Sequence, residues 1–261
     1  MRSIAIINQK GGVGKTTTAV NLGHALARRG NRVTLVDLDP QGHLAACLGL
    51  FRLPNKGMDQ VLLHGQDIAE QLISSRELID VVPAGRELGE FEHIDGGIER
   101  ARVLRQAIGR SVPDTDFMVF DCPPSAGLLV ANAVAAVDDV LVPVAGDYVS
   151  LTGLTRLMLT IRKLEPLRAG PLGKAIFLSR FIARRRLSSE VMGKLLEHFP
   201  TLLLRTSIRE AAALAECAGA GRTIFEYKPN SKSAAEFDSL ADDFLKHRVM
   251  GDEQEQNSDV A

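Results

Sequence analysis

Glycine, lysine and threonine residues near the N-terminus have the spacing of a loop that binds phosphate. Residues 10–17 read Lys-Gly-Gly-Val-Gly-Lys-Thr-Thr, directly after the apolar segment 4–7. The glycines permit backbone conformations that turn successive N–H groups inward around an anion. Lys15 adds a positive charge, and Thr16 offers a hydroxyl to Mg²⁺. We predict a nucleoside-triphosphate site that comprises Lys10, Gly11, Gly12, Val13, Gly14, Lys15, Thr16 and Thr17.

A second lysine, Lys10, stands at the entrance of this loop. It reaches the phosphates of its own loop less easily than Lys15 does. In a dimer it can instead reach the nucleotide of the facing subunit and neutralise charge in the transition state, as an arginine finger does. The alternative is an ordinary solvated loop lysine. Its place within the phosphate-binding motif favours the first interpretation.

Three aspartates follow apolar segments that have the composition of strands. Asp37 and Asp39 come after the β-branched-rich run 33–36, and Asp121 ends the run 117–120. In open α/β folds, ligands bind at the carboxyl ends of the strands. Period-two spacing places Asp37 and Asp39 on one face, although the turn at Pro40 can re-aim the second. One of them can serve the Mg²⁺ shell and the other can orient the attacking water, while Asp121 is expected to hold Mg²⁺ through a water.

Strands and helices must alternate along the chain to position these groups. The strands are expected near residues 4–7, 33–36, 79–82, 117–120, 140–144 and 175–179. The helices are expected near residues 17–29, 58–63, 68–72, 98–108, 125–136, 151–164, 188–198 and 234–247. Repeated strand–helix units predict an α/β fold in which helices cover both faces of a mostly parallel, twisted sheet.

Length and composition agree with one such domain. A chain of 261 residues that is 45% hydrophobic can bury one large core, and we expect a single domain over residues 1–248. The polar, acidic tail over residues 249–261 is expected to be disordered. The formal net charge is −1, so binding to nucleic acid would need a local basic patch. No secretory or membrane-spanning segment is indicated, which favours a cytoplasmic location.

Several motifs together resemble one known family. Residues 10–16 resemble the deviant phosphate-loop (Walker A) motif of the ParA/MinD superfamily of dimeric ATPases, and Asn8-Gln9, Thr17-Thr18 and Asn21-Leu22 resemble its ParA branch. Residues 36–42 resemble the second acidic motif, and residues 117–125 resemble the Walker B motif and switch. Residues 224–233 are a weaker match. The resemblance covers about residues 2–246, and its first three motifs are specific.

The resemblance implies a function for the whole chain. It implies ATP and Mg²⁺ as cofactors and an ATP-bound homodimer in which each Lys10 reaches across to the other nucleotide. Lys10, Lys15 and Asp39 would be the catalytic residues, with Asp39 needed for hydrolysis and Asp37 in the Mg²⁺ shell. Such ATPases bind DNA without sequence preference, hydrolyse ATP slowly alone, and are stimulated by a ParB-like or cargo-adaptor partner. The cargo, whether plasmid, chromosome, protein complex or organelle, stays open.

The densest positive charge is the run Arg184-Arg185-Arg186, which suits phosphate contacts with DNA. The alternative is a solvated charge run at the start of a helix. Arg184 aligns with an arginine that resembles one used for DNA binding by chromosomal ParA proteins, whereas Ala213 stands where a second such arginine is expected. The remaining candidates for the same face are Arg205, Arg209, Arg222 and Lys232. These residues predict association with the nucleoid.

A MinD-like regulator without DNA binding is the alternative function. MinD-like members end in an amphipathic helix that binds the membrane, usually rich in lysine. Here the segment from Gly251 is acidic, and anionic lipid would repel it. We therefore expect no membrane partner.

Overall fold

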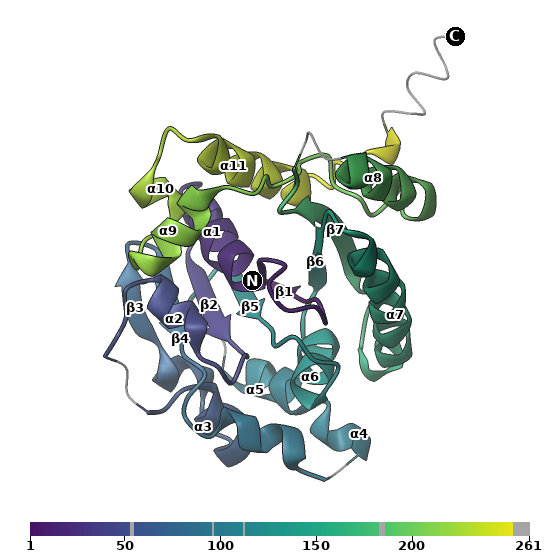
Figure 1. Cartoon of the computed structure of the whole chain (residues 1–261). Coiled ribbons are helices and arrows are strands. Elements are labelled where there is room, and N and C mark those ends of the chain that lie inside the picture. Colours follow the sequence, from purple (N-terminus) through teal and green to yellow (C-terminus); the bar gives the residue numbers. More distant parts are fainter. Residues whose placement is uncertain (53–54, 96, 112, 183–185, 253–261) are drawn as a thin grey trace.

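Parallel strands form the centre of the molecule. The computed structural model describes residues 1–52, 55–95, 97–111, 113–182 and 186–252, and within these ranges seven strands form one sheet in the order β3-β4-β2-β5-β1-β6-β7 (Figure 1). All the pairings are parallel except the antiparallel pairing of β3 with β4. The strands are β1 (Arg2–Ile6), β2 (Val33–Asp37), β3 (Ile73–Arg76), β4 (Ile79–Val82), β5 (Phe117–Asp121), β6 (Asp139–Ala145) and β7 (Gly173–Ser179).

Helices connect the strands and cover both faces of the sheet, which confirms the predicted fold class. Within the described ranges they are α1 (Lys15–Ala27), α2 (His43–Cys47), α3 (Met58–His64), α4 (Gly97–Arg100), α5 (Val103–Arg110), α6 (Leu128–Ala136), α7 (Tyr148–Leu164), α8 (Arg186–His198), α9 (Ala212–Gly219), α10 (Ile224–Tyr227) and α11 (Lys232–Leu245). The described part of the chain also contains three short 3-10 helices, which span Ile68–Gln71, Leu88–His93 and Glu165–Leu167. Among the described residues, no helix combines the length and the apolar character that crossing a membrane requires.

Alternation along the central strands divides the core into two layers. In β1, Ile4 and Ile6 pack with residues of α1, α9 and α11 on one face. Ala5, together with Ile7 just after the strand, packs with residues of α3, α6 and α7 on the other face. Burial of one such isoleucine contributes about 1.5–3 kcal/mol, so both layers fix the register of β1 and hence the start of the loop that follows it.

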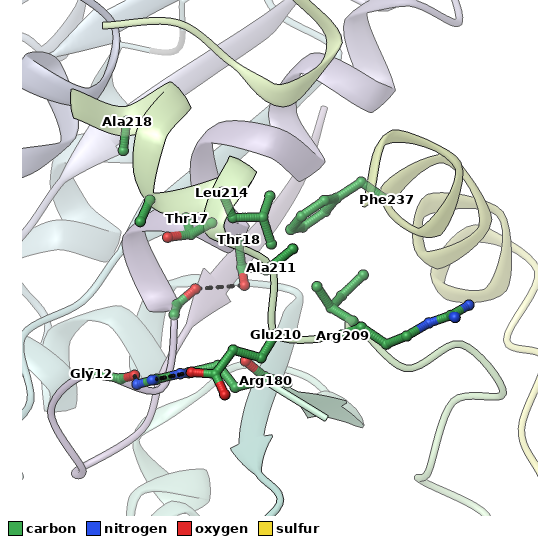
Figure 2. A pocket seen from close by; sticks show the side chains of 14 residues that line it. Gly12, Thr17, Thr18, Arg180, Arg209, Glu210, Ala211, Leu214, Ala218 and Phe237 are labelled. Carbon is green, nitrogen blue, oxygen red and sulfur yellow. Dashed lines mark hydrogen bonds and ion pairs between the residues drawn. The ribbon is translucent and has the colours of Figure 1, made fainter. Parts of the chain in front are cut away.

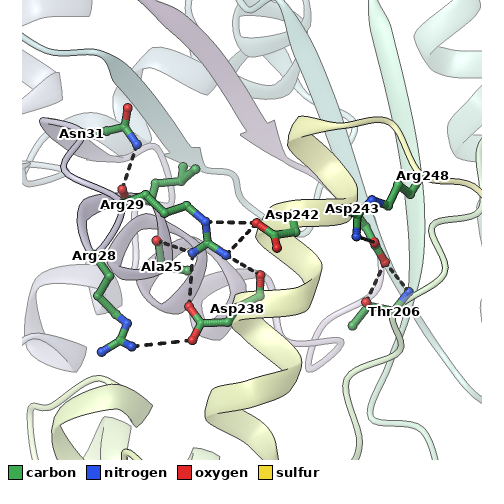
Figure 3. Close-up of polar contacts among 10 residues, drawn as sticks. Ala25, Arg28, Arg29, Asn31, Thr206, Asp238, Asp242, Asp243 and Arg248 are labelled. Carbon is green, nitrogen blue, oxygen red and sulfur yellow. Dashed lines mark hydrogen bonds and ion pairs between the residues drawn. The ribbon is translucent and has the colours of Figure 1, made fainter.

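Polar contacts fasten α11 to two other parts of the chain (Figure 3). Arg29, just after α1, forms ion pairs with Asp238 (3.1 Å) and Asp242 (2.8 Å) of α11. Asp243 is buried and accepts hydrogen bonds from the N–H (2.9 Å) and the hydroxyl (2.6 Å) of Thr206. Because Thr206 precedes α9, these contacts hold the stretch between α8 and α9 against α11.

Some local predictions are wrong. The predicted helix over residues 68–72 is a 3-10 helix in the structure, and β3, which follows it, has no counterpart in the sequence prediction. This strand reads Ile-Ser-Ser-Arg and forms the edge of the sheet, so it lacks the apolar pattern of the buried strands. The predicted helix over residues 98–108 is divided into α4 and α5, and α2, α9 and α10 are also absent from the prediction.

The packed domain extends past the predicted boundary at residue 248. Val249 is buried, and the N–H of Met250 donates to the carbonyl of Leu203 at 2.8 Å. A strand-like contact between Leu204 and Val249 accompanies this hydrogen bond. Residues 253–261 of the predicted tail lie outside the described residues.

Candidate functional site

The loop between β1 and α1 has the backbone of a phosphate-binding loop. Gly12 and Gly14 adopt positive φ angles of 73° and 91°, which glycine reaches without steric cost. Gly14 is the N-cap of α1, and no described side chain caps this end of the helix. The N-terminal N–H groups of α1 are therefore available to an anion, as the sequence predicts.

Two buried side chains anchor this loop to the neighbouring strands. Asn8 donates to the carbonyl of Pro143 in β6 (2.7 Å) and accepts the N–H of Lys10 (2.9 Å). The hydroxyl of Ser179, at the end of β7, donates to the carbonyl of Val13 (2.5 Å). The sequence analysis noted Asn8 only as part of the family resemblance. No local signal in the sequence identifies Ser179, because it lies 166 positions from its partner.

The acidic residues meet at the carboxyl edge of the sheet. Asp37 and Asp121 occupy paired positions in the neighbouring strands β2 and β5, and Asp121 also pairs with Ile6 at the end of β1. Both carboxylates are buried. The strand register therefore brings together, next to the loop, two groups that stand 84 positions apart in the sequence (121 − 37).

Asp121 is a buried carboxyl in need of a cationic partner. Neither of its oxygens makes a hydrogen bond of normal geometry, and burial raises its pKa to about 7. The hydroxyl of Thr16 and the ammonium of Lys15 lower this pKa, and Asp39 raises it. An orphaned buried carboxylate beside a threonine hydroxyl is a donor set that fits Mg²⁺, which prefers oxygen ligands and retains water.

Asp37 and Asp39 have different surroundings. Asp37 accepts the N–H groups of Asp39 (3.0 Å) and Leu44 (3.1 Å). Burial and the neighbouring Asp121 nevertheless hold the pKa of Asp37 well above its ordinary value. Asp39 is only partly buried, and one of its oxygens accepts the N–H of Gln41 (3.0 Å). This geometry suits Asp37 to a supporting position in the Mg²⁺ shell. It leaves Asp39 nearer to the solvent from which an attacking water would come.

Lys15 and Lys10 likewise differ in how deeply they are buried. Lys15 is buried, and desolvation lowers its pKa while the charges of Asp121 and Asp39 oppose that shift. Lys10 is partly exposed, and its ammonium contacts both oxygens of Asp147 at 2.8 and 2.6 Å. Asp147 is the second residue after β6, and the sequence analysis did not single it out.

A cavity of about 340 Å³ adjoins the loop and is lined by parts of the chain that are distant in sequence (Figure 2). Gly12, Thr17 and Thr18 line it from the side of the predicted phosphate loop. Its opposite wall is mostly apolar and contains Ile208, Ala211, Leu214, Ala215, Ala218 and Phe237. The combination of an apolar wall with a few polar groups is typical of a small-molecule site and matches the ring system of a nucleoside.

The predicted DNA-binding residues are dispersed. Arg184 and Arg185 lie outside the described residues, and Arg186, the first residue of α8, pairs with Glu190 at 2.9 Å. Arg209 pairs with Glu236 at 2.5 Å. Arg205 donates to the carbonyl of Val249 at 3.1 Å.

The remaining two candidates, Arg222 and Lys232, are exposed. Arg222 precedes α10, which lies on the other side of α11 from α8 in Figure 1. Arg186 and Arg222 therefore do not form one cluster in this chain.

Comparisons with known proteins identify the family of this chain. Residues 1–169 match the family described as AAA domain. The sporulation initiation inhibitor protein Soj of Bacillus subtilis is 36% identical over 242 residues, which cover 91% of this chain and 96% of Soj. The chromosome partitioning protein ParA of Myxococcus xanthus is 36% identical over 251 residues, covering 94% of this chain and 88% of that protein.

A solved structure is similar over the same length. Cobyrinic acid a,c-diamide synthase from Mycobacterium smegmatis, with bound ADP and magnesium, has a TM-score of 0.80 at 29% identity and covers 95% of both chains. This neighbour shows that the fold accommodates a nucleotide with Mg²⁺. From the match to the AAA domain and the two relatives, the chain belongs to the ParA/Soj family of partition ATPases, within the ParA/MinD superfamily.

Proposed function

We propose that this protein is an ATPase that dimerises on binding ATP, binds DNA non-specifically in that state, and segregates or positions a cargo. The single observation that carries the ATPase assignment is the buried Asp121 carboxylate, which makes no hydrogen bond of normal geometry and lies beside Lys15 and Thr16. Without a cation this arrangement is costly, and with a Mg²⁺-nucleotide it is compensated. Partition relatives at 36% identity support the cargo-positioning part.

The loop residues divide the work of binding the nucleotide. The N–H groups around Gly12 and Gly14 and the start of α1 bind the phosphates, and Lys15 neutralises their charge. Thr16 would hold Mg²⁺ directly, and Asp37 and Asp121 would hold it through water. A Mg²⁺ ion held there would supply positive charge that offsets the charge of the phosphates. Asp39 would orient the attacking water.

Lys10 would complete the site of a second subunit. In the single chain it is held by Asp147, so dimer formation must exchange this contact for one with the partner's nucleotide. A half-exposed ion pair contributes about 0–1 kcal/mol, so a nucleotide phosphate can outcompete it. Because transition-state stabilisation waits for the dimer, hydrolysis is slow in the isolated protein and is accelerated by a ParB-like or cargo-adaptor partner.

DNA binding would use exposed cations on the described part of the chain, chiefly Arg186, Arg222 and Lys232, together with Arg184 and Arg185. The names of the relatives support a chromosomal substrate and an association with the nucleoid. The second candidate function is an ATP-switched regulator of the MinD-like type without DNA binding. Dispersal and pairing of the predicted basic residues favour this alternative.

The deciding experiment measures binding of the purified protein to unrelated duplex DNA with ATP, ADP or no nucleotide, over a salt series. Salt-sensitive binding only with ATP is the expected result, since phosphate contacts release counterions. If no state binds DNA while ATP still produces dimers, the regulator function is correct.

A further inference from the structure

The outward-facing carbonyls of the phosphate loop have their own partners. A loop whose N–H groups turn inward toward phosphate directs carbonyl oxygens outward, where each needs a donor. The last residue of β7 and the residue that follows it provide donors for two consecutive carbonyls. Ser179 donates to Val13 at 2.5 Å, and the guanidinium of Arg180 donates to Gly12 at 2.9 Å.

Arg180 reaches the loop because its backbone leaves the extended conformation. In a regular strand, adjacent side chains point to opposite faces, so Ser179 and Arg180 would not both face the loop. Arg180 has a φ angle of +50°, in the left-handed region that L-residues rarely adopt. A strained conformation at a site of this kind indicates that the side chain has a function there.

The same guanidinium also holds the segment that closes the cavity. A second nitrogen of Arg180 pairs with Glu210 at 2.5 Å, just before the apolar wall formed by Ala211 and Leu214 (Figure 2). The backbone of this segment is already attached to the end of β7, since Phe181 donates to Ile208 (3.0 Å) and accepts from Glu210 (3.1 Å). The single side chain of Arg180 therefore connects the phosphate loop to this apolar wall, which we call the base-side wall because a nucleoside would pack against it.

This connection also separates two cavities. Gly12, Arg180 and Glu210 line both the 340 Å³ cavity and a neighbouring one of about 170 Å³ that contains Lys10 and Asp147. The Arg180–Glu210 pair is thus the boundary between the side where a nucleoside fits and the side from which Lys10 extends.

We infer that Arg180 is a nucleotide-positioning residue, which holds the carbonyl of Gly12 and the carboxylate of Glu210 so that the phosphate loop and the base-side wall keep the spacing a nucleoside triphosphate requires. This inference rests on the proposed nucleotide site. Arg180 acts through the loop and the wall, and the expected result of its loss is weaker binding with little change in turnover at saturating ATP.

Glycine is the informative substitution at this position. Because a φ of +50° suits glycine, R180G removes the side chain and relieves the backbone, so the variant should fold with the melting temperature of the wild type. R180K retains the charge, but its single nitrogen cannot bridge the two acceptors as a guanidinium does. E210Q keeps the shape of the partner and removes its charge. The matched control is K174A, which removes an ion pair with Glu165 at the opposite end of the same strand.

The experiment measures the Kd of a fluorescent ATP analogue with Mg²⁺, the KM and kcat for ATP, and the melting temperature of each variant. We expect R180G to raise Kd and KM about tenfold, the effect of one charge-assisted hydrogen bond, with kcat within twofold of the wild type. R180K should recover part of this loss, E210Q should give about a threefold increase, and K174A should have no effect.

Two failures are distinguishable. If the wild-type protein does not bind the analogue, the proposed nucleotide site is wrong. If the wild type binds and R180G binds equally well, the positioning role is wrong while the nucleotide site stands. A loss of kcat at unchanged KM would also overturn the inference, since it would make Arg180 a residue that acts only in the transition state.

Discussion

The nucleotide site and the predicted DNA-binding surface differ in how their charged side chains are arranged and paired. At the nucleotide site, strand register brings Asp37 and Asp121 together beside Lys15, and neither oxygen of Asp121 makes a hydrogen bond of normal geometry. On the predicted DNA surface, Arg186 and Arg209 each pair with a glutamate of this chain. Concentrated, uncompensated charge indicates a ligand that supplies the compensation, whereas dispersed and paired charge is close to an ordinary protein surface.

The largest expected effect comes from Lys15, which lies at the nucleotide site, where charge is concentrated. Lys15→Ala should weaken ATP binding at least about 100-fold, because a buried cation aimed at phosphate is removed while Asp121 remains buried. Isothermal titration with ATP and Mg²⁺ measures this loss. Retained micromolar binding would mean that the charges at this site do not serve a nucleotide.

Asp39 tests hydrolysis separately from binding. Asp39→Ala should retain ATP binding, lower the rate of hydrolysis about 100-fold, and leave an ATP-bound dimer that persists. A phosphate-release assay, combined with size-exclusion chromatography in ATP, measures both properties. Hydrolysis at the normal rate in this variant would remove Asp39 from the mechanism.

The raised pKa of Asp121 should make the stability of the protein depend on pH. Burial raises the pKa of this carboxyl from 3.8 to about 7, so the folded state binds its proton more tightly than the unfolded chain does. Without nucleotide, the free energy of unfolding should therefore fall as pH rises through the window from about 4 to about 7, where the stabilisation is lost. In Asp121→Asn, the melting temperature should fall by a few degrees less than in the wild type over this pH range. The same variant should lose the stabilisation by Mg²⁺ and ATP. Thermal melts at pH 5 and pH 8 test it, and a variant with the pH dependence of the wild type would contradict the assignment.

The smallest expected effect is on the dispersed surface. Arg186→Ala should weaken DNA binding about two- to threefold and reduce the salt dependence by less than one counterion, because Glu190 already compensates this arginine. Glu190→Gln is the matched variant and should strengthen DNA binding slightly by releasing Arg186. A tenfold loss in Arg186→Ala would show that this arginine is a principal DNA contact.

The sequence predicted the parts of the site that are local in the chain or set by strand ends. The residues from Lys10 to Thr17 form the loop after β1 and the start of α1. Asp37 and Asp121 end strands whose apolar pattern is clear, so parallel register brings them together. Asp147, Arg180 and Glu210 were not predictable, because a charged residue after a strand is ordinary until the fold shows what it faces. The DNA surface is the least predictable part, since side chains at helix ends pair with whichever acid lies nearby.

The same contrast applies to the fold. Buried strands such as β5 and β6 have unbroken apolar runs, and both are close to their predicted bounds. The edge strand β3 and the alanine-rich α9 have no such signal, and their structure depends on neighbours that tertiary packing supplies.

The contact between Lys10 and Asp147 gives added electrolyte two opposing effects on one protein. Both side chains are more than a third exposed, so ions weaken their attraction and make Lys10 easier to release toward a second subunit. The same ions weaken contacts between basic side chains and DNA phosphates. If the protein dimerises with ATP and binds DNA as proposed, its assembly should therefore tolerate, or even benefit from, an ionic strength that already detaches it from DNA.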